Sequence, residues 1–408
     1  MKFYLKLAWR NILRNKRRTI IASIAIGVGL ASLILTDGLM IGMKNNLVES
    51  ATSSLLGQAQ IHNKDFRISR DIEKTIVAKD DITRKLESDP LVAAYSERVV
   101  SLGMITSPST AESVIVYGID PETEKELSKI DDRIIKGTYF GENKGREIII
   151  GSKLAEVLEV TLGDRIVITV AQAFGGDLSQ EMFRVSGIYH FDVKEMDNGF
   201  AFIRKDKAGT MLNIGNNIHE IAIKFSDIRI AEKKDLSFWG EYSAGNNEAV
   251  SWITIMPELK NILDMTDIAL YMMGGILFFV VIFGIINSLF MSLYERMFEF
   301  GILKAVGTRP SGLGKLIIFE AGWLAIVSIV IGVVIGFVLH LLLIRNGINY
   351  GGIEFAGTFM HDKIYPVMNI SQYIKYPVFV FFFTIVVGLY PAWVAGKMKV
   401  TDALRKSM

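Results

Sequence analysis

The chain has few side chains arranged for catalysis. Cysteine is absent, which excludes disulfides, thiolate nucleophiles and cysteine-bound metals. The histidines are His62, His190, His219, His340 and His361. They are scattered and lack the close spacing of metal ligands. The sequence therefore predicts neither a metal site nor hydrolytic chemistry.

A nucleotide-binding loop is also missing. The nearest candidate is the segment Gly312-Leu-Gly-Lys315, but Leu316 stands where a P-loop needs Ser or Thr, and the first glycine of the motif is absent. We expect a chain that is not an enzyme, binds no cofactor directly, and depends on ATP only through another protein.

A short loop, residues 295–320, has a regular sequence pattern that indicates a contact surface and not a catalytic site. Its apolar residues recur at helical spacing, and they are Phe298, Ile302, Leu303 and Val306. This spacing predicts one apolar stripe on a short surface helix that Gly307 ends. The stripe needs a partner, and the residues alone allow either a protein or the membrane surface.

Asp37 is the only ionisable residue between Arg18 and Lys44. Acids inside membrane spans usually face protein or water. Asp37 is therefore a candidate for contact with a cargo's polar head or with a second copy of the same span, although an acid that merely reaches the outer interface fits equally well. The nearby Met40 could offer acyl chains an adaptable surface, or could simply pack between helices.

Four apolar spans must position these residues. They are predicted at 19–43, 268–294, 321–344 and 376–396. Each is long enough to cross a bilayer, since about 20 residues at ~1.5 Å each span the hydrocarbon. A basic start followed by an apolar stretch is shared with cleaved signal peptides, but the first stretch far exceeds their core of roughly 7–15 residues. An uncleaved anchor is the better interpretation.

Basic residues predict the orientation, because the positive flanks stay cytoplasmic. They gather in residues 1–18, in the loop 295–320 and in the tail 397–408, which we expect inside. Residues 44–267 and the loop 345–375 are then on the outer side. The large insertion has 27 Lys and Arg against 36 Asp and Glu, a net charge of −9, while the whole chain is +2. This balance gives no argument for nucleic acid.

The flanks of the spans have helical character. Lys2, Lys6, Arg10 and Arg14 recur at every fourth position, which predicts an amphipathic elbow helix over 1–18 on the inner leaflet, or else a simple basic flank. The first span should continue as helix to about residue 51. The second should begin far ahead of the membrane, at Pro257, because proline suits a helix start.

The insertion predicts an α+β domain, in one piece or in two lobes. Expected strands are 59–62, 113–117, 147–150, 165–170, 183–188 and 220–225, and expected helices are 81–88, opened by Asp80 or Asp81, and 121–129, opened by Asp120. The run Ala171–Glu181 predicts a hairpin whose glycine-rich tip, Phe174, Gly175 and Gly176, could grip a partner or could be an ordinary loop.

Several segments together resemble the FtsX-like permease family, which includes lipoprotein-releasing permeases, MacB-type exporters and FtsX itself. The matching segments are Ala8–Arg18, Gly145–Gly151, Leu162–Asp164, Glu299–Gly307, Phe319–Ala321, Tyr390–Ala392 and Ala403–Arg405. The resemblance covers nearly the whole chain. It implies an α-helical membrane protein with four transmembrane helices and a large α+β extracytoplasmic domain, MacB-like, inserted between helices 1 and 2.

The resemblance also implies a function. The chain would be the permease subunit of a type VII ABC transporter in the bacterial inner membrane, working with a cytoplasmic ATPase and with a second permease copy or paralogue. ATP-driven motion would pass through the coupling loop to the periplasmic domain. Residues implied to contact the ATPase are Glu299, Phe300, Gly301, Ile302, Lys304, Ala305 and Gly307.

Length and layout favour the lipoprotein-releasing type, in which a periplasmic chaperone accepts the lipoprotein. MacB-type efflux and an FtsX-like receptor or scaffold for an envelope protein remain alternatives. One departure concerns the hairpin 171–181, which lacks the proline and arginine of chaperone-recruiting members. A conducting channel is disfavoured, because four spans with one acid lack the polar stripe of a pore.

Overall fold

The computed structural model describes residues 2–14, 16–141, 145–191, 194–348, 353–355, 358–360 and 363–399. The chain divides into two compact units. The helical unit comprises Met1–Asn45, Leu263–Gly351 and Asp362–Met408, and the α/β unit comprises Asn46–Ile262 with Gly352–His361. The segment Ala403–Arg405, which contributed to the family resemblance, lies outside the described residues.

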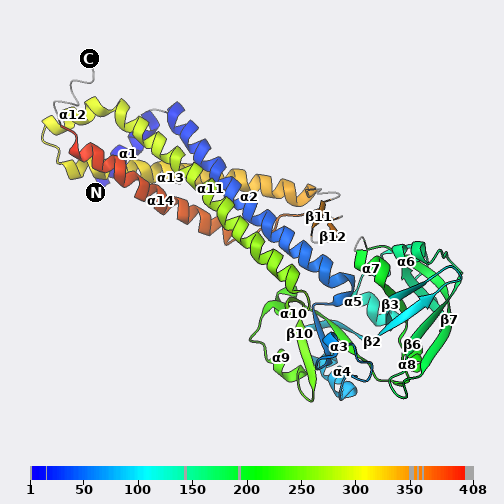
Figure 1. The fold of residues 1–408 in the computed structure, drawn as a ribbon. Helices are drawn as coiled ribbons and strands as arrows, with labels where there is room; N and C mark the ends of the chain where they lie inside the picture. Colours follow the sequence, from blue (N-terminus) through cyan, green and yellow to red (C-terminus); the bar gives the residue numbers. More distant parts are fainter. Residues whose placement is uncertain are drawn as a thin grey trace. The chain divides into compact units, whose positions relative to one another are not determined.

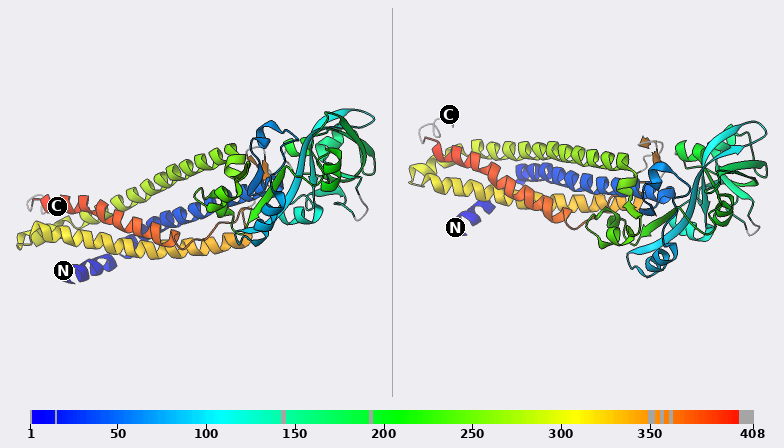
Figure 2. Two further views of the ribbon diagram at one scale, coloured as in Figure 1. Left: turned by 90° about the horizontal axis from the view of Figure 1, so that it is seen from below. Right: turned by 60° about the horizontal axis from the view of Figure 1, so that its bottom comes forward.

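Six helices are described in the helical unit. They are α1 (Lys2–Arg14), α2 (Lys16–Ala51), α11 (Pro257–Glu295), α12 (Met297–Ala305), α13 (Pro310–Asn346) and α14 (Gln372–Lys397). Helices α2, α11, α13 and α14 are long and apolar enough to cross a membrane. Figures 1 and 2 show α12 at the same end of this unit as α1 and the end of α14.

The elbow prediction needs one correction. Helix α1 ends at Arg14, and Arg17 and Arg18 already belong to α2, so the predicted helix over 1–18 is shorter at its carboxyl end. Arg and Lys are good helix formers and do not end a helix by themselves. Arg18 is also held in place, because it pairs with Glu295 and donates to the Ser292 hydroxyl at 2.9 Å.

Small residues let α2 and α13 approach closely. A Cβ added at Gly332 would lie 2.7 Å from the Gly27 carbonyl oxygen, and one added at Gly336 would lie 3.5 Å from the Ala31 Cα. Glycines four residues apart are a common device of membrane helix pairs, because backbone–backbone proximity replaces the missing hydrophobic driving force. The sequence therefore specifies a tight α2–α13 contact.

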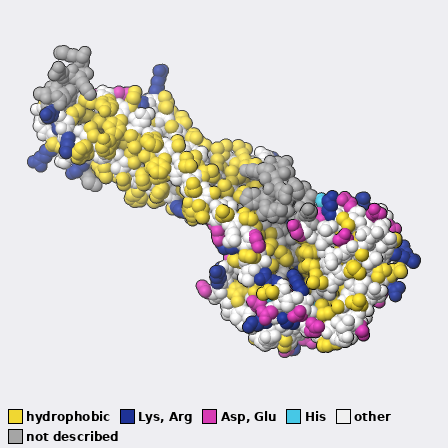
Figure 3. Space-filling view, in the orientation of Figure 1, with side chains coloured by type: hydrophobic (Ala, Val, Ile, Leu, Met, Phe, Trp, Pro, Cys, Tyr) yellow, Lys and Arg dark blue, Asp and Glu magenta, His cyan; other side chains and the backbone are white. Residues whose placement is uncertain are grey.

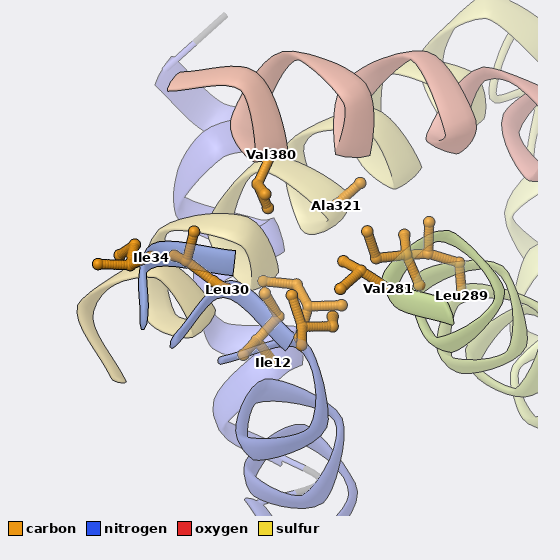
Figure 4. Close-up of a cluster of buried hydrophobic side chains, with 10 residues drawn as sticks. Ile12, Leu30, Ile34, Val281, Leu289, Ala321 and Val380 are labelled. Atoms are coloured by element: carbon orange, nitrogen blue, oxygen red, sulfur yellow. The ribbon is translucent and has the colours of Figure 1, made fainter. Parts of the chain in front are cut away.

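Apolar side chains fill the space between the long helices. Figure 4 shows Leu30 and Ile34 of α2, Val281 and Leu289 of α11, and Val380 of α14 converging in one buried cluster. The face of the helical unit that Figure 3 shows is also largely apolar. A bundle that is apolar both inside and outside is typical of a membrane protein.

The α/β unit is built on a mixed sheet of ten strands. They are β1 (Ala59–Asn63), β2 (Val92–Thr106), β3 (Ala111–Ile119), β4 (Ile134–Gly137), β5 (Glu147–Gly151), β6 (Arg165–Ala171), β7 (Leu178–Tyr189), β8 (Phe200–Arg204), β9 (Glu220–Phe225) and β10 (Asn247–Ser251). Their order is β10-β1-β9-β2-β3-β8-β5-β7-β4, with β6 pairing to β2 and β7. A separate pair joins β11 (Ile353–Phe355) and β12 (Thr358–Met360).

Short helices connect these strands. They are α3 (Phe66–Ser69), α4 (Lys79–Ser88), α5 (Pro121–Leu127), α6 (Ser152–Val157), α7 (Lys194–Gly199), α8 (Lys205–Met211), α9 (Ser237–Tyr242) and α10 (Trp252–Ile255), with a π turn at Thr52–Leu56 and a 3-10 turn at Ile228–Glu232.

Two helix starts test the capping predictions. For α5 the prediction is confirmed, because the Asp120 carboxylate accepts from the Glu122 backbone N–H at 3.1 Å. For α4 it is wrong, because the helix begins at Lys79 after Ala78, which has a φ of 53° and no side-chain cap. Asp80 and Asp81 lie inside the first turn, where carboxylates still favour the positive end of the helix.

The long strand β2 was not predicted. It pairs with β9, β3 and β6, and so joins the two halves of the sheet. Its centre carries Arg98, which is fully buried and hydrogen-bonded to Glu124 at 2.7 and 3.0 Å and to Glu220 at 2.8 Å. Burial opposes the charge, but the two carboxylates keep the pKa of Arg98 above its ordinary value. Because a charged residue lies in the middle of β2, the sequence pattern did not indicate a buried strand there.

Candidate coupling site and membrane crevice

Helix α12 is the short helix predicted in the loop between the second and third spans. It begins after Arg296 and ends at Ala305, and two residues later the chain turns at Gly307, whose φ of 99° favours a residue without a Cβ. The N–H of Gly307 donates to the Lys304 carbonyl at 3.0 Å, and that of Thr308 to the Leu303 carbonyl at 2.9 Å. Pro310 then opens α13 at its first position. The predicted helix and its glycine stop are both confirmed.

A network of charged groups fastens the start of α12 to the bundle. Arg296 donates to Glu320 of α13 at 2.6 Å and to Glu299 of α12 at 3.0 Å. Glu320 also accepts from Asn11 of α1 at 2.6 Å, and Glu299 pairs with Arg14 of α1. The network therefore joins α1, α12 and α13.

Burial makes the inner part of this network the stronger one. The side chains of Arg296 and Glu320 are 8% and 9% exposed, whereas Glu299 is 41% exposed. Burial disfavours the charge of Arg296, but Glu320 and Glu299 raise its pKa above the ordinary value. Partial burial likewise opposes ionisation of Glu299, but hydrogen bonds from Arg296 and Arg14 keep its pKa below the ordinary value. Both groups are charged at neutral pH.

A second link fastens the end of α12. The Lys304 ammonium donates to the backbone carbonyls of Gly396 and Met398, both at 2.7 Å. These carbonyls lie at the carboxyl end of α14, where the helix dipole favours a cation. Helix α12 is thus held at both ends to other helices of the unit.

The residues expected to contact an ATPase separate into two groups. Ile302, Ala305 and Gly307 are exposed. Phe300 and Gly301 are buried in the bundle, where the Phe300 ring lies beneath Arg296, 4.9 Å from its guanidinium carbon. The expectation that Phe300 and Gly301 meet a partner therefore needs correction, because their side of α12 packs inward.

Glu299 and Lys304 also have partners within the chain, as the two links show. The apolar side chains Phe298, Ile302 and Val306 are instead 44%, 43% and 82% exposed. They recur at every fourth position, so they share one face of α12 and of its C-cap residue, Val306. We call Phe298, Ile302 and Val306 the exposed stripe.

Arg296, Glu320 and Arg14 were not assigned to the site from sequence. Arg296 and Glu299 are three residues apart, which is the spacing of a helical ion pair and could have suggested a link. The connection to Glu320 and Arg14 depends on tertiary structure, and local spacing could not reveal it.

The predicted hairpin 171–181 is confirmed. Strands β6 and β7 pair up to Ala171 and Leu178, and Gly175 and Gly176 take φ values of 96° and 72° at the tip. Phe174 is 64% exposed. The tip therefore presents an aromatic side chain to the surroundings.

Asp37 and Met40 line a crevice between α2, α11 and α14. Its volume is about 440 Å³. The Asp37 carboxylate interacts with the Tyr376 hydroxyl of α14. One turn beyond Met40, the Lys44 ammonium pairs with Asp267 of α11 at 2.8 Å. Both predicted residues therefore face a space within one chain.

Comparisons with known proteins agree with these features. Residues 19–233 match the family model of the MacB-like periplasmic core domain, and residues 271–400 match that of the FtsX-like permease C-terminal domain. The chain belongs to this MacB-like, FtsX-like permease family. It is an ABC transporter permease of the Lol, MacB and FtsX type, and its relatives and four apolar helices indicate a multi-pass protein of the inner membrane.

Among the relatives of this permease are two lipoprotein-releasing system transmembrane proteins. LolE of Haemophilus influenzae is 21% identical over 344 residues, which cover 82% of each chain. LolC of Buchnera aphidicola subsp. Schizaphis graminum is 24% identical over 405 residues, which cover 96% of this chain and 95% of the relative. The crystal structure of the periplasmic region of MacB from Actinobacillus actinomycetemcomitans is 15% identical and covers 50% of this chain and 92% of its own, with a TM-score of 0.35.

Proposed function

We propose that this permease works with a separate cytoplasmic ATPase, which binds the exposed stripe of α12, and that it transmits ATP-driven motion to its α/β unit. The observation that carries the proposal is the division of α12 into two faces. Its charged residues are engaged with neighbouring helices, while Phe298, Ile302 and Val306 remain exposed. An apolar face at a polar end of the molecule is typical of a protein contact.

The anchoring of α12 supports transmission of motion. A force that displaces α12 would act on the Arg296–Glu320 hydrogen bond at one end of the helix and on the Lys304 hydrogen bonds at the other. Helices α11, α13 and α14 would then move with it, because packed helices shift as rigid elements. Helices α2 and α11 both continue without interruption from the helical unit into the α/β unit. The route of the motion would follow these two helices.

The cargo we propose is lipoprotein, which would leave the inner membrane when the α/β unit moves. The support is the similarity to LolE and LolC over most of both chains. In this proposal the termini and α12 are cytoplasmic and the α/β unit is periplasmic. A second permease, a copy or a paralogue, would complete the transporter. Asp37 and Met40 line a space within one chain, so we do not assign them to the interface with that second permease.

The decisive experiment is affinity purification of the full chain from native membranes in mild detergent, followed by mass spectrometry and an ATPase assay of the eluate. We expect an ABC ATPase and lipoproteins to co-purify with nucleotide turnover. Val306→Asp should remove the ATPase from the eluate, because Val306 is the most exposed member of the stripe. Phe174→Asp, an equally drastic change at the hairpin tip, is the matched control and should retain the ATPase.

Two outcomes would count against the proposal. If the wild-type protein retains no ATPase, an envelope receptor or scaffold becomes the better explanation. If Val306→Asp retains the ATPase as well as Phe174→Asp does, the exposed stripe is not the contact, and the membrane surface is its partner instead.

A further inference from the structure

The crevice between α2, α11 and α14 has the size of a ligand site. Its volume of about 440 Å³ falls within the ~300–1,000 Å³ of small-molecule sites. Two glycines on α11, Gly274 and Gly275, form part of its wall, and a Cβ added to either would meet no atom within 4 Å. Open space against a helix backbone leaves room for a slender apolar group such as an acyl chain.

Polarity changes with depth along the crevice. Lys44 and Asp267 pair with each other at one end, and Leu33, Phe278 and Phe379 line the other. Lys44 and Leu33 are eleven residues apart on α2, a rise of about 16 Å. A ligand that fills the crevice therefore has a polar head and an apolar tail.

Two charged groups lie between these ends. Asp37 interacts with the Tyr376 hydroxyl, and Lys375 is the neighbour of Tyr376 on α14, with its ammonium 5.7 Å from the centre of that ring. Within the described residues, no basic group lies within 4 Å of the Asp37 carboxylate, and no carboxylate lies within 4 Å of the Lys375 ammonium. The pair Lys44–Asp267 is already satisfied, so Asp37 and Lys375 are the charges available to a ligand.

The position of Lys375 adds to the positive charge. It lies in the first turn of α14, which contains no acidic residue. The positive end of the helix dipole is therefore uncompensated, and a lysine at that end is unfavourable without an anion. A phosphate would satisfy the Lys375 ammonium, which lines the crevice.

We propose that this crevice binds one zwitterionic, amine-bearing phospholipid of the phosphatidylethanolamine class. The phosphate meets Lys375, the ammonium donates hydrogen bonds to Asp37, and one acyl chain follows the glycine-lined wall towards Phe278. Phosphatidylglycerol lacks a cation for Asp37. Phosphatidylcholine carries the cation, but its trimethylammonium has no N–H to donate. The bound lipid is distinct from the transported cargo, and the inference does not rest on an ATPase.

Native mass spectrometry of the full chain in detergent tests this, with the three phospholipids compared at equal chain length. We expect phosphatidylethanolamine to bind about tenfold more tightly than the other two, since a hydrogen bond to a charged group typically contributes a factor of this order. Asp37→Asn should abolish the preference while leaving phosphatidylglycerol binding unchanged. Lys375→Gln should weaken all three lipids, and Gly275→Phe, which fills the crevice, should remove the specific site.

A matched control is Lys397→Gln at the other end of α14, where the ammonium lies 4.2 Å from the Trp393 ring centre. It should leave all three affinities unchanged. Equal binding of the three lipids, or a preference that survives Asp37→Asn, would overturn the proposal. A third outcome would also overturn it. If a synthetic diacylated lipopeptide binds in a Gly275-dependent manner but displaces no phospholipid, the crevice is a cargo site. These lipid-binding measurements do not depend on the ATPase, so a failure of the proposed function would not change them.

Discussion

Replacing Arg296 by methionine tests whether α12 is held by its buried charges. The substitution keeps the apolar stem and removes the guanidinium, which leaves Glu320 buried with Asn11 as its remaining side-chain partner among the described residues. Breaking one side of a buried ion pair typically costs about 3–5 kcal/mol. The lost contact to the half-exposed Glu299 adds at most about 1 kcal/mol. We therefore expect a local destabilisation of roughly 3 kcal/mol or more.

Hydrogen exchange of the backbone amides of α12 measures this directly. A change of about 3 kcal/mol in local opening corresponds to more than a hundredfold faster exchange. Arg14→Gln is the matched control, because it removes only an exposed pair with Glu299, whose side chains are 53% and 41% exposed. Exchange in that variant should rise by about fivefold at most.

A double variant separates the buried charge from the lost contact. Adding Glu320→Gln to Arg296→Met removes the uncompensated carboxylate, so part of the protection of α12 should return. If Arg296→Met exchanges no faster than Arg14→Gln, or if Glu320→Gln gives no recovery in the double variant, the buried network does not hold α12 and the reasoning is refuted.

Three further predictions concern the rest of the molecule. Burial lowers the pKa of His219, so the unfolded chain binds a proton more readily than the folded one. Stability should therefore be retained above about pH 6.5 and fall as the pH drops below it. In His219→Gln, the free energy of unfolding should depend less steeply on pH below about 6.5 than in the wild type. Gly332→Leu should separate α2 from α13, since its Cβ would lie 2.7 Å from the Gly27 carbonyl oxygen. The control is Gly322→Leu, where a Cβ meets nothing within 4 Å. In detergent, the midpoint of thermal unfolding should be markedly lower for Gly332→Leu than for Gly322→Leu. Arg98→Met should destabilise the α/β unit by about 3–5 kcal/mol in denaturant unfolding, while Arg98→Met combined with Glu124→Leu and Glu220→Leu should recover much of that loss.

Much of the architecture followed from local signals. Long apolar stretches with at most one charged residue predicted the four long helices, and Pro257 marked the start of α11 because proline is favoured at the first position of a helix. Gly307 marked the end of α12 for a similarly local reason, its positive φ. Each of these features depends on residues within one or two turns of each other.

The features that escaped prediction depend on distant partners. Strand β2 carries Arg98 at its buried centre, and a buried arginine is stable there only because Glu124 and Glu220 arrive from other elements. The uncapped start of α4 at Ala78 similarly has no local sequence signal. Sequence periodicity assumes that charged residues face water, and it fails where charges neutralise one another inside the fold.

The coupling loop shows the same effect of tertiary structure. Charged residues in a short loop suggest contacts with a partner, yet Glu299 and Lys304 hold α12 against its own bundle. This arrangement has a mechanical advantage. Charged links to α1, α13 and α14 fix the helix at both ends, and the exposed stripe offers a partner a surface whose contact breaks none of those links. In the proposed function, an ATPase that binds there would move α12 without breaking these links.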